Sequence, residues 1–177
     1  MKETIYNYDY LTDNDITEVV VRTKALIIKN ENILVGNENG LFQFPGGHLE
    51  KNESITDCLK REVLEETGIE LDDEEIKRPF YKVTFLSKDW PEKGKNRKAE
   101  IYYYIVETNK DVNLLKTKYT EHEKQGNFKI ESFKLADAIN KIKENIPNNE
   151  KNKIISPDMI GAIEEYIKQN DDSKLKL

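Results

Sequence analysis

Cysteine is almost missing from this 177-residue chain, which contains only Cys58. A single thiol excludes a disulfide within the chain and a zinc site built from several thiolates. Cys58 lies beside apolar residues that recur at four-residue spacing, so we interpret it as a residue of the packed core.

Long apolar runs are also missing, and no stretch approaches the roughly 20 residues that a membrane helix needs. The first six residues, Met-Lys-Glu-Thr-Ile-Tyr, lack the apolar centre of a signal peptide. We therefore expect a cytoplasmic protein with no membrane partner.

Basic residues do not exceed acidic ones: 28 Lys and Arg stand against 34 Asp and Glu, a net charge of −6. Stable nucleic-acid complexes usually need a basic face, so we expect none here. A small anionic substrate remains compatible, because a bound divalent metal reverses the local field. The length suits one domain spanning residues 1–177, and nothing in the sequence specifies an oligomeric state.

Hydrophobic residues make up 37% of the chain and gather in short runs, which is enough for a core. Six runs have the composition of strands: residues 17–29, 33–35, 41–44, 80–86, 100–107 and 127–133. Three segments read as helices: residues 54–67, 135–145 and 155–169, the last beginning near Ser156-Pro157. This mixture predicts an α/β fold in layers.

The helix predicted over residues 54–67 has clear signals at both ends. Ser54 is a good N-cap, and Asp57 three residues later suggests a short form of the capping box. Gly68 stands where a left-handed C-cap belongs. Apolar residues recur at four-residue spacing and form one buried stripe: Ile55, Leu59 and Val63.

An acidic face lies on the same helix. Glu62, Glu65 and Glu66 stand at i, i+3 and i+4, where like charges repel and weaken a bare helix. A hard divalent cation such as Mg²⁺ would neutralise them. Arg61 beside them can fix the orientation of one glutamate. Gly46 and Gly47 let backbone approach a ligand closely and offer carbonyl oxygens as further hard ligands.

Gly47 to Ile69 resembles the Nudix box, a 23-residue motif of the form G-x5-E-x7-R-E-U-x-E-E-x-G-U in which U is aliphatic. Every defined position matches, and Pro45 resembles the usual lead-in. The resemblance implies a Nudix α/β/α sandwich with a mixed β-sheet. It also implies Mg²⁺, or Mn²⁺ as a substitute, and attack by water on a phosphorus of a nucleoside diphosphate linked to another moiety.

Carried over by position, the resemblance makes Glu62, Glu65 and Glu66 metal ligands, with the Gly46 carbonyl as a further ligand. Glu53 is a supporting carboxylate outside the innermost ligands. Arg61 belongs to the catalytic set. The general base stays open between Glu62 and a glutamate from a later loop.

Weaker candidates lie outside the box. Glu100, Glu121 and Glu123 could supply a later carboxylate, and His48 could contact substrate phosphate. Residues 87–99 look like a long loop with five basic residues. Such a loop is either a solvated connection or a mobile phosphate clamp, with Arg97 as its two-pronged donor.

Two other functions are compatible with these residues. One is a pyrophosphohydrolase that trims the 5′ end of RNA, which the acidic charge disfavours and the basic segment mildly favours. The other is a module of the same fold that binds nucleotides without hydrolysing them. Such modules usually lose box glutamates, and all are present here.

Overall fold

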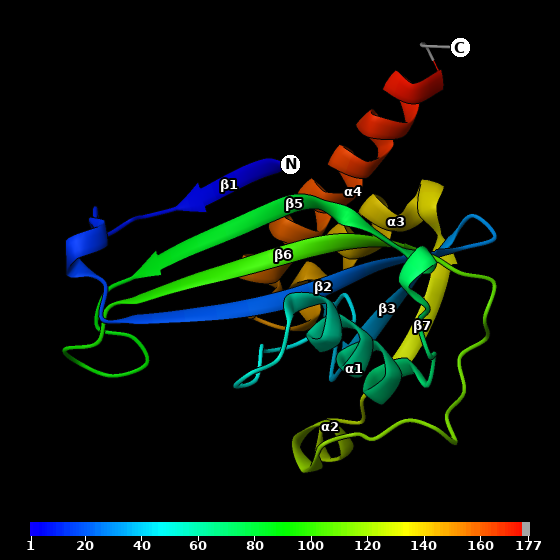
Figure 1. Cartoon of the computed structure of the whole chain (residues 1–177), viewed down its shortest axis with the longest axis horizontal. Helices are drawn as coiled ribbons and strands as arrows, with labels where there is room; N and C mark the ends of the chain where they lie inside the picture. The colour runs from blue at the N-terminus through cyan, green and yellow to red at the C-terminus, as the bar shows by residue number, and fades with distance from the viewer. Residues whose placement is uncertain (175–177) are drawn as a thin grey trace.

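A seven-stranded mixed sheet forms the centre of the protein (Figure 1), seen in a computed structural model that describes residues 1–174. The last three residues of the predicted domain 1–177 lie outside the described residues. The strand order is β1-β5-β6-β2-β3-β4, with β7 paired to β3. The strands are β1 (Lys2–Tyr6), β2 (Glu18–Lys29), β3 (Asn32–Glu38), β4 (Leu41–Gln43), β5 (Ile76–Ser87), β6 (Arg97–Glu107) and β7 (Lys129–Lys134).

Helices cover both faces of the sheet. The helices are α1 (Ile55–Thr67), α2 (Glu121–Gln125), α3 (Leu135–Asn145) and α4 (Asn152–Lys174). Because side chains alternate along a strand, β2 sends Leu26 into the core beneath α3 and α4 and Ala25 into the core beneath α1. These two cores confirm the predicted α/β/α sandwich with a mixed sheet.

The helix α1 begins and ends close to the predicted positions. The Ser54 hydroxyl oxygen accepts a hydrogen bond from the Asp57 backbone N–H at 3.1 Å, as an N-cap should. The same hydroxyl donates to the Asp57 carboxylate at 2.6 Å, which is not the reciprocal contact of a capping box. Gly68 ends the helix with φ 71°, the predicted left-handed conformation. Leu59 and Val63 are fully buried.

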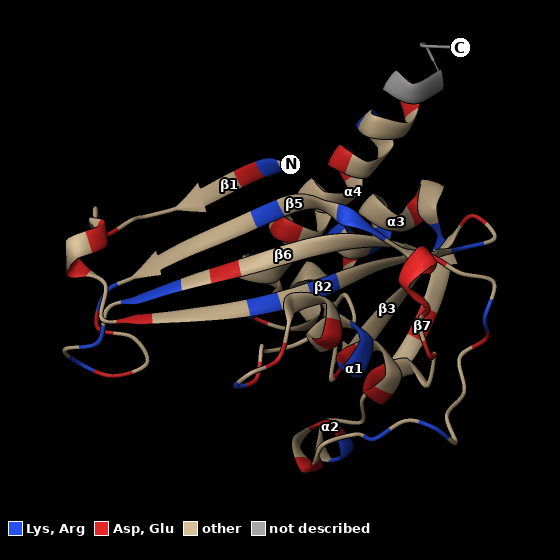
Figure 2. Cartoon of the chain, viewed as in Figure 1, with Lys and Arg blue, Asp and Glu red and all other residues tan. Residues whose placement is uncertain are grey.

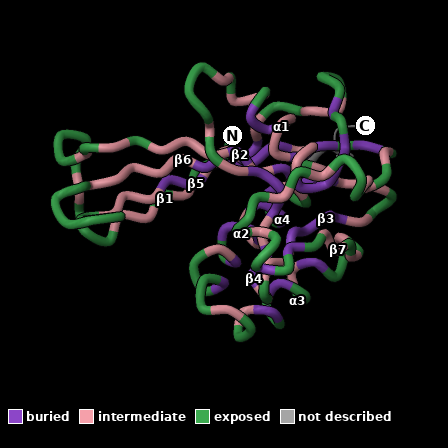
Figure 3. The backbone as a smooth tube through the Cα atoms, turned by 90° about the horizontal axis from the view of Figure 1, so that it is seen from below, coloured by how far each residue is buried: buried purple, intermediate pink, exposed green. Residues whose placement is uncertain are grey.

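The connection between β5 and β6 is shorter than the sequence suggested. The predicted loop 87–99 is wrong at both ends, because Ser87 belongs to β5 and Arg97 begins β6. Pairing with β2 extends β6, since Arg97 lies opposite Glu18 in parallel register. Figure 3 shows this end of the sheet reaching away from the helices with few buried residues. Because solvent surrounds this end of the sheet, its residues are polar although the backbone forms strands.

The last helix also differs from its predicted start. The helix α4 begins at Asn152, so Pro157 lies inside it rather than at its first turn. The buried Asn152 side chain donates to the carbonyls of Gly40 at 2.8 Å and Asn145 at 2.9 Å. These hydrogen bonds hold the first turn of α4, which no local sequence signal predicted. The strand β1 and the short helix α2 were likewise not expected from the sequence. No helix within the described residues has the length and apolar character to cross a membrane.

Candidate active site

The turn before α1 is fixed against the edge of β2. The Ala25 backbone N–H donates to the Pro45 carbonyl at 2.8 Å, and the Thr23 N–H donates to the Gly47 carbonyl at 3.0 Å. Gly46 has φ +135°, and a Cβ at this position would clash with the Thr23 carbonyl. Glycine is therefore required at position 46 for both conformation and space.

The acidic face of α1 packs directly on this turn. A Cβ on Gly47 would overlap the carboxylate of Glu62. The Gly46 backbone N–H donates to Glu66 Oε2 at 3.3 Å. The paired glycines thus let two carboxylates of α1 approach the backbone.

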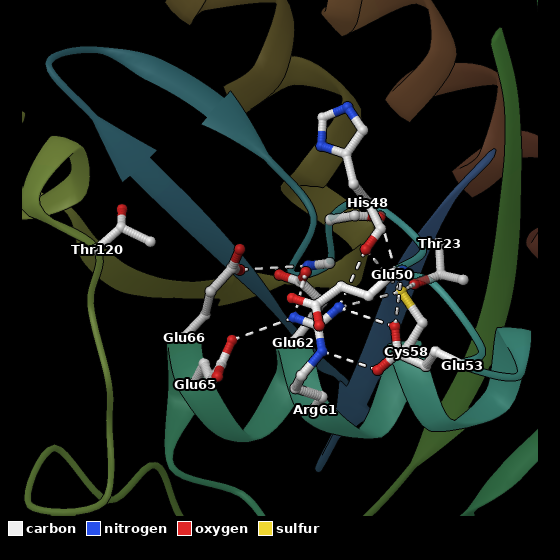
Figure 4. Close-up of polar contacts among 12 residues, drawn as sticks. Thr23, His48, Glu50, Glu53, Cys58, Arg61, Glu62, Glu65, Glu66 and Thr120 are labelled. Atoms are coloured by element: carbon white, nitrogen blue, oxygen red, sulfur yellow. Dashed lines mark hydrogen bonds and ion pairs between the residues drawn. The ribbon is translucent and has the colours of Figure 1, made fainter. Parts of the chain in front are cut away.

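Arg61 holds the glutamates in place (Figure 4). Its Nε donates to Glu53 Oε1 at 2.8 Å, while Nη1 donates to Glu62 Oε1 at 2.7 Å and to Glu65 Oε2 at 3.3 Å. Its Nη2 donates to Glu53 Oε2 at 3.0 Å and to the His48 carbonyl at 3.0 Å. The predicted pairing of Arg61 with a glutamate is confirmed, and Arg61 joins three glutamates to the turn. Its hydrogen bond holds the pKa of Glu53 below the usual range.

Glu66 is a buried carboxylate, with 5% of its surface exposed. Burial raises its pKa to about 8, against the opposing charge of Lys24. Burial also raises the pKa of Glu62, against its bond to Arg61. Two carboxylates with little solvent lie together here, and such an arrangement needs positive charge nearby.

Lys24 supplies part of that charge, and the sequence analysis missed it. Its Nζ donates to the Gly46 carbonyl at 2.5 Å and to Gln43 Oε1 at 3.3 Å. Burial lowers the pKa of Lys24, while Glu66 and Glu62 act in the opposite direction. The available signal was a lysine in the middle of the predicted strand 17–29, where an unpaired charge would be unfavourable.

The donor atoms at this site suit a hard divalent cation. All are oxygens, from the carboxylates of α1 and the Gly46 carbonyl, which already accepts from the Lys24 ammonium. Across residues 1–174 no three His, Cys, Asp or Glu side chains converge closely enough to hold an ion by themselves. Arg61 holds Glu62 and Glu65, while Glu66 bonds to the turn. A metal at this site would therefore compete with Arg61 for the glutamates.

The later glutamates lie in different environments. Glu123 on α2 is partly buried, and its charge acts on Glu66 and Lys24, although burial dominates both of their pKa shifts. Glu121 is exposed and pairs with Lys124 at 2.7 Å. Glu100 pairs with Lys82 at 2.8 Å on β5. The structure thus brings Glu123, but neither Glu121 nor Glu100, toward the α1 carboxylates.

His48 lies against β2, and Arg97 lies in a strand. The His48 ring accepts a hydrogen bond from Arg22 Nε at 2.9 Å through Nε2. Desolvation lowers the pKa of His48, and the charge of Arg22 lowers it further. Arg97 lies in β6, where its Nε donates to Glu18 at 2.7 Å. The prediction that Arg97 lies in a loop is wrong, because it begins β6 and pairs with Glu18, while its role in binding phosphate stays a prediction.

The family model of the NUDIX domain matches residues 19–151, which is most of the chain and includes α1 and its turn. The chain belongs to the Nudix family. This Nudix chain is 34% identical over 68 residues to an 8-oxo-dGTP diphosphatase of Buchnera aphidicola. That match covers 38% of this chain and 47% of the relative, so the similarity spans about half of the relative's length.

Solved structures share the fold of this Nudix protein. The solution structure of the E. coli ORF135 protein superposes with a TM-score of 0.56 at 16% identity, covering 86% of this chain and 91% of that one. A MutT protein from Bacillus halodurans gives a TM-score of 0.51 at 20% identity, covering 68% and 72%. At such identities the likeness establishes the fold and nothing about substrate.

Proposed function

We propose that this Nudix protein hydrolyses a pyrophosphate bond in a nucleoside diphosphate linked to another moiety, with Mg²⁺ as its metal and Mn²⁺ as a substitute. The observation that carries the proposal is the acidic face of α1 packed on the Gly46–Gly47 turn. Glu62, Glu65, Glu66 and the Gly46 carbonyl would hold the metal. The metal would neutralise phosphate oxygens and lower the pKa of a water.

The protein's own residues prepare the site for that chemistry. Arg61 orients Glu62 and Glu65 through charge-assisted bonds and ties them to Glu53. The paired glycines bring backbone close enough to contact a phosphate chain. Lys24 at the Gly46 carbonyl adds positive charge for the developing negative charge of the transition state.

Two carboxylates are candidates for accepting the proton of the attacking water. Glu62 lies against the turn with a raised pKa, mainly from burial, which makes it a better base than an exposed glutamate. Glu123 lies on α2 on the side of Glu66 and Lys24. Replacing each with Gln identifies the base, since only loss of the base removes the acidic limb of the kcat profile against pH.

The substrate we propose is a small nucleotide. The relative that this chain matches over about half of its length is an 8-oxo-dGTP diphosphatase, which acts on a nucleotide. This similarity supports nucleoside triphosphates as the first class of substrate to test. The net charge of −6 disfavours a long nucleic acid.

A substrate panel with Mg²⁺ tests the function. The panel holds nucleoside triphosphates including oxidised ones, ADP-ribose, dinucleoside polyphosphates and triphosphorylated RNA. We expect metal-dependent release of a nucleoside monophosphate or phosphate from a small nucleotide, abolished by EDTA. Turnover of RNA alone would replace the proposal with 5′-end trimming. Tight binding without turnover across the panel would indicate a nucleotide-binding module instead.

A further inference from the structure

Arg22 combines partial burial with the lack of an acidic partner among residues 1–174. Arg61 and Arg97 both form ion pairs with glutamates, and Arg78 is exposed on β5. Arg22 is partly buried on β2, yet within residues 1–174 it forms no ion pair. A partly buried guanidinium without a counter-charge is unfavourable, so this position favours the binding of an anion.

The contacts of Arg22 leave its two terminal nitrogens available. A short antiparallel bridge joins Arg22 to His48, and Nε donates to His48 Nε2 at 2.9 Å. Neither Nη1 nor Nη2 makes a hydrogen bond to another described residue. Because the imidazole accepts through Nε2, an uncharged His48 carries its proton on Nδ1 and is itself a donor there.

Arg22 lies on the same face of the sheet as Lys24. The two residues are two positions apart on β2, which is roughly 7 Å along a strand. Lys24 contacts the Gly46 carbonyl, the candidate metal ligand. Figure 2 shows basic positions on β2 beside the acidic helix α1. Lys24 and Arg22 thus place two positive groups in a row on β2, with Lys24 nearer to the α1 carboxylates.

Arg97 strengthens the positive field at Arg22. Burial lowers the pKa of Arg22, and the neighbouring Arg97 lowers it further, although a guanidinium stays charged in proteins. Glu18 offsets Arg97 through its 2.7 Å ion pair. The uncompensated charge therefore resides on Arg22.

We propose that the Arg22 guanidinium binds the phosphate that forms the linked moiety itself, which is the γ-phosphate of a nucleoside triphosphate, so that the enzyme favours such a substrate over one whose linked moiety is an uncharged sugar. A guanidinium grips phosphate through two parallel N–H···O bonds, and the group offers donors only. This inference rests on the proposed function, whose substrate class it narrows to nucleoside triphosphates and polyphosphates.

The kinetic test compares Arg22→Met and Arg22→Lys with Arg78→Met, a matched loss of charge at an exposed position of β5. With dGTP, Arg22→Met should raise KM at least tenfold with a smaller change in kcat. With ADP-ribose the change should stay below threefold. Arg22→Lys should give an intermediate KM for dGTP, since an ammonium cannot bind in two-pronged fashion. Arg78→Met should match the parent protein on both substrates.

A binding measurement separates failure of this site from failure of the proposed function. Isothermal titration with inorganic tripolyphosphate, without turnover, should show binding to the parent protein that Arg22→Met weakens at least tenfold. That result together with no nucleotide hydrolysis would sink the function and retain the site. Hydrolysis of dGTP with unchanged KM and tripolyphosphate affinity in Arg22→Met would overturn the site alone. Equal losses with dGTP and ADP-ribose would also overturn it. If Arg22→Met does not fold, the comparison rests on Arg22→Lys, for which parent-like KM and affinity count against the proposal.

Discussion

Glu65 and Glu66 are adjacent in the sequence, but their side chains have different surroundings. Glu66 is buried and bonded to the Gly46 backbone, whereas Glu65 is partly exposed and held by Arg61 at 3.3 Å. Both stand on the face of α1 that we propose holds the metal. A Gln replacement keeps the shape of each side chain and removes one charge, so it tests that role without a cavity.

Glu65→Gln and Glu66→Gln should each lower kcat at saturating substrate by at least two orders of magnitude. This corresponds to about 2.7 kcal/mol of activation free energy. Glu74→Gln is the control, because Glu74 is exposed and outside the site. Steady-state kinetics at fixed Mg²⁺ measure the effect. Turnover near that of the parent protein in both variants would exclude these residues as metal ligands.

At the scale of the element, α1 joins three tasks in thirteen residues. One stripe fills the core between the helix and the sheet, the adjoining side carries the glutamates, and its start is fixed by Ser54. The cap at Ser54 lies at the start of the helix and does not touch the glutamates. Its loss should therefore affect the free energy of unfolding more than kcat.

Ser54→Ala should lower the free energy of unfolding by about 0.5–2 kcal/mol, the usual effect of losing an N-cap side chain. Ser54→Thr should retain most of the stability, since its hydroxyl also accepts from the Asp57 backbone N–H and donates to the Asp57 carboxylate. Urea unfolding measures both. Ser54 makes no contact with the α1 glutamates, so kcat should change less than twofold. An Ala variant as stable as the parent would show that tertiary packing alone sets the start of α1.

At the scale of the whole molecule, buried charge links stability to metal and to pH. Any ion that binds the folded chain and not the unfolded one stabilises it by mass action. The acidic face of α1 should therefore make the melting temperature depend on Mg²⁺.

The Tm should rise between zero and millimolar Mg²⁺ and return to its starting value with EDTA. Thermal unfolding followed by circular dichroism measures the change. Glu66→Gln should show a smaller rise, because it removes a proposed ligand, while Glu74→Gln should respond like the parent. A Tm that is the same at all Mg²⁺ concentrations would contradict a metal site in the folded protein.

Asp158 on α4 should make stability depend on pH. It is 3% exposed, its Oδ1 has no hydrogen-bond partner among the described residues, and burial raises its pKa to about 7 against a bond from Tyr6. In the unfolded chain its pKa is about 3.9. The folded state thus holds the proton more tightly, and this group's contribution to stability falls as pH rises from about 4 to about 7.

Asp158→Asn should remove that contribution, so the free energy of unfolding should fall less between pH 5 and 8 than in the parent. Urea unfolding at four pH values without metal measures the slopes. Glu144→Gln, which removes an exposed carboxylate from α3, should keep the parent slope. Parallel curves for Asp158→Asn and the parent would show that Asp158 is ionised in the folded protein without loss of stability.

What the sequence determined by itself is local. The cap at Ser54, the left-handed Gly68 and the shared face of Glu62, Glu65 and Glu66 all follow from residues within four positions of one another. The box that carries them identified the family, and the α/β/α sandwich followed from that resemblance. Short-range periodicity and capping are properties of the chain itself, and for this reason they could be predicted.

The tertiary structure decided everything that depends on strand register. Pairing with β2 drew Arg97 into β6, and docking of the turn on β2 brought Lys24 to Gly46 and Arg22 to His48. Folding of the later segment brought Glu123, rather than Glu121 or Glu100, toward Glu66. These contacts join residues 20 or more positions apart, and no local pattern fixes them. Register is set by the packing of the whole sheet, so only the folded chain shows which charges meet.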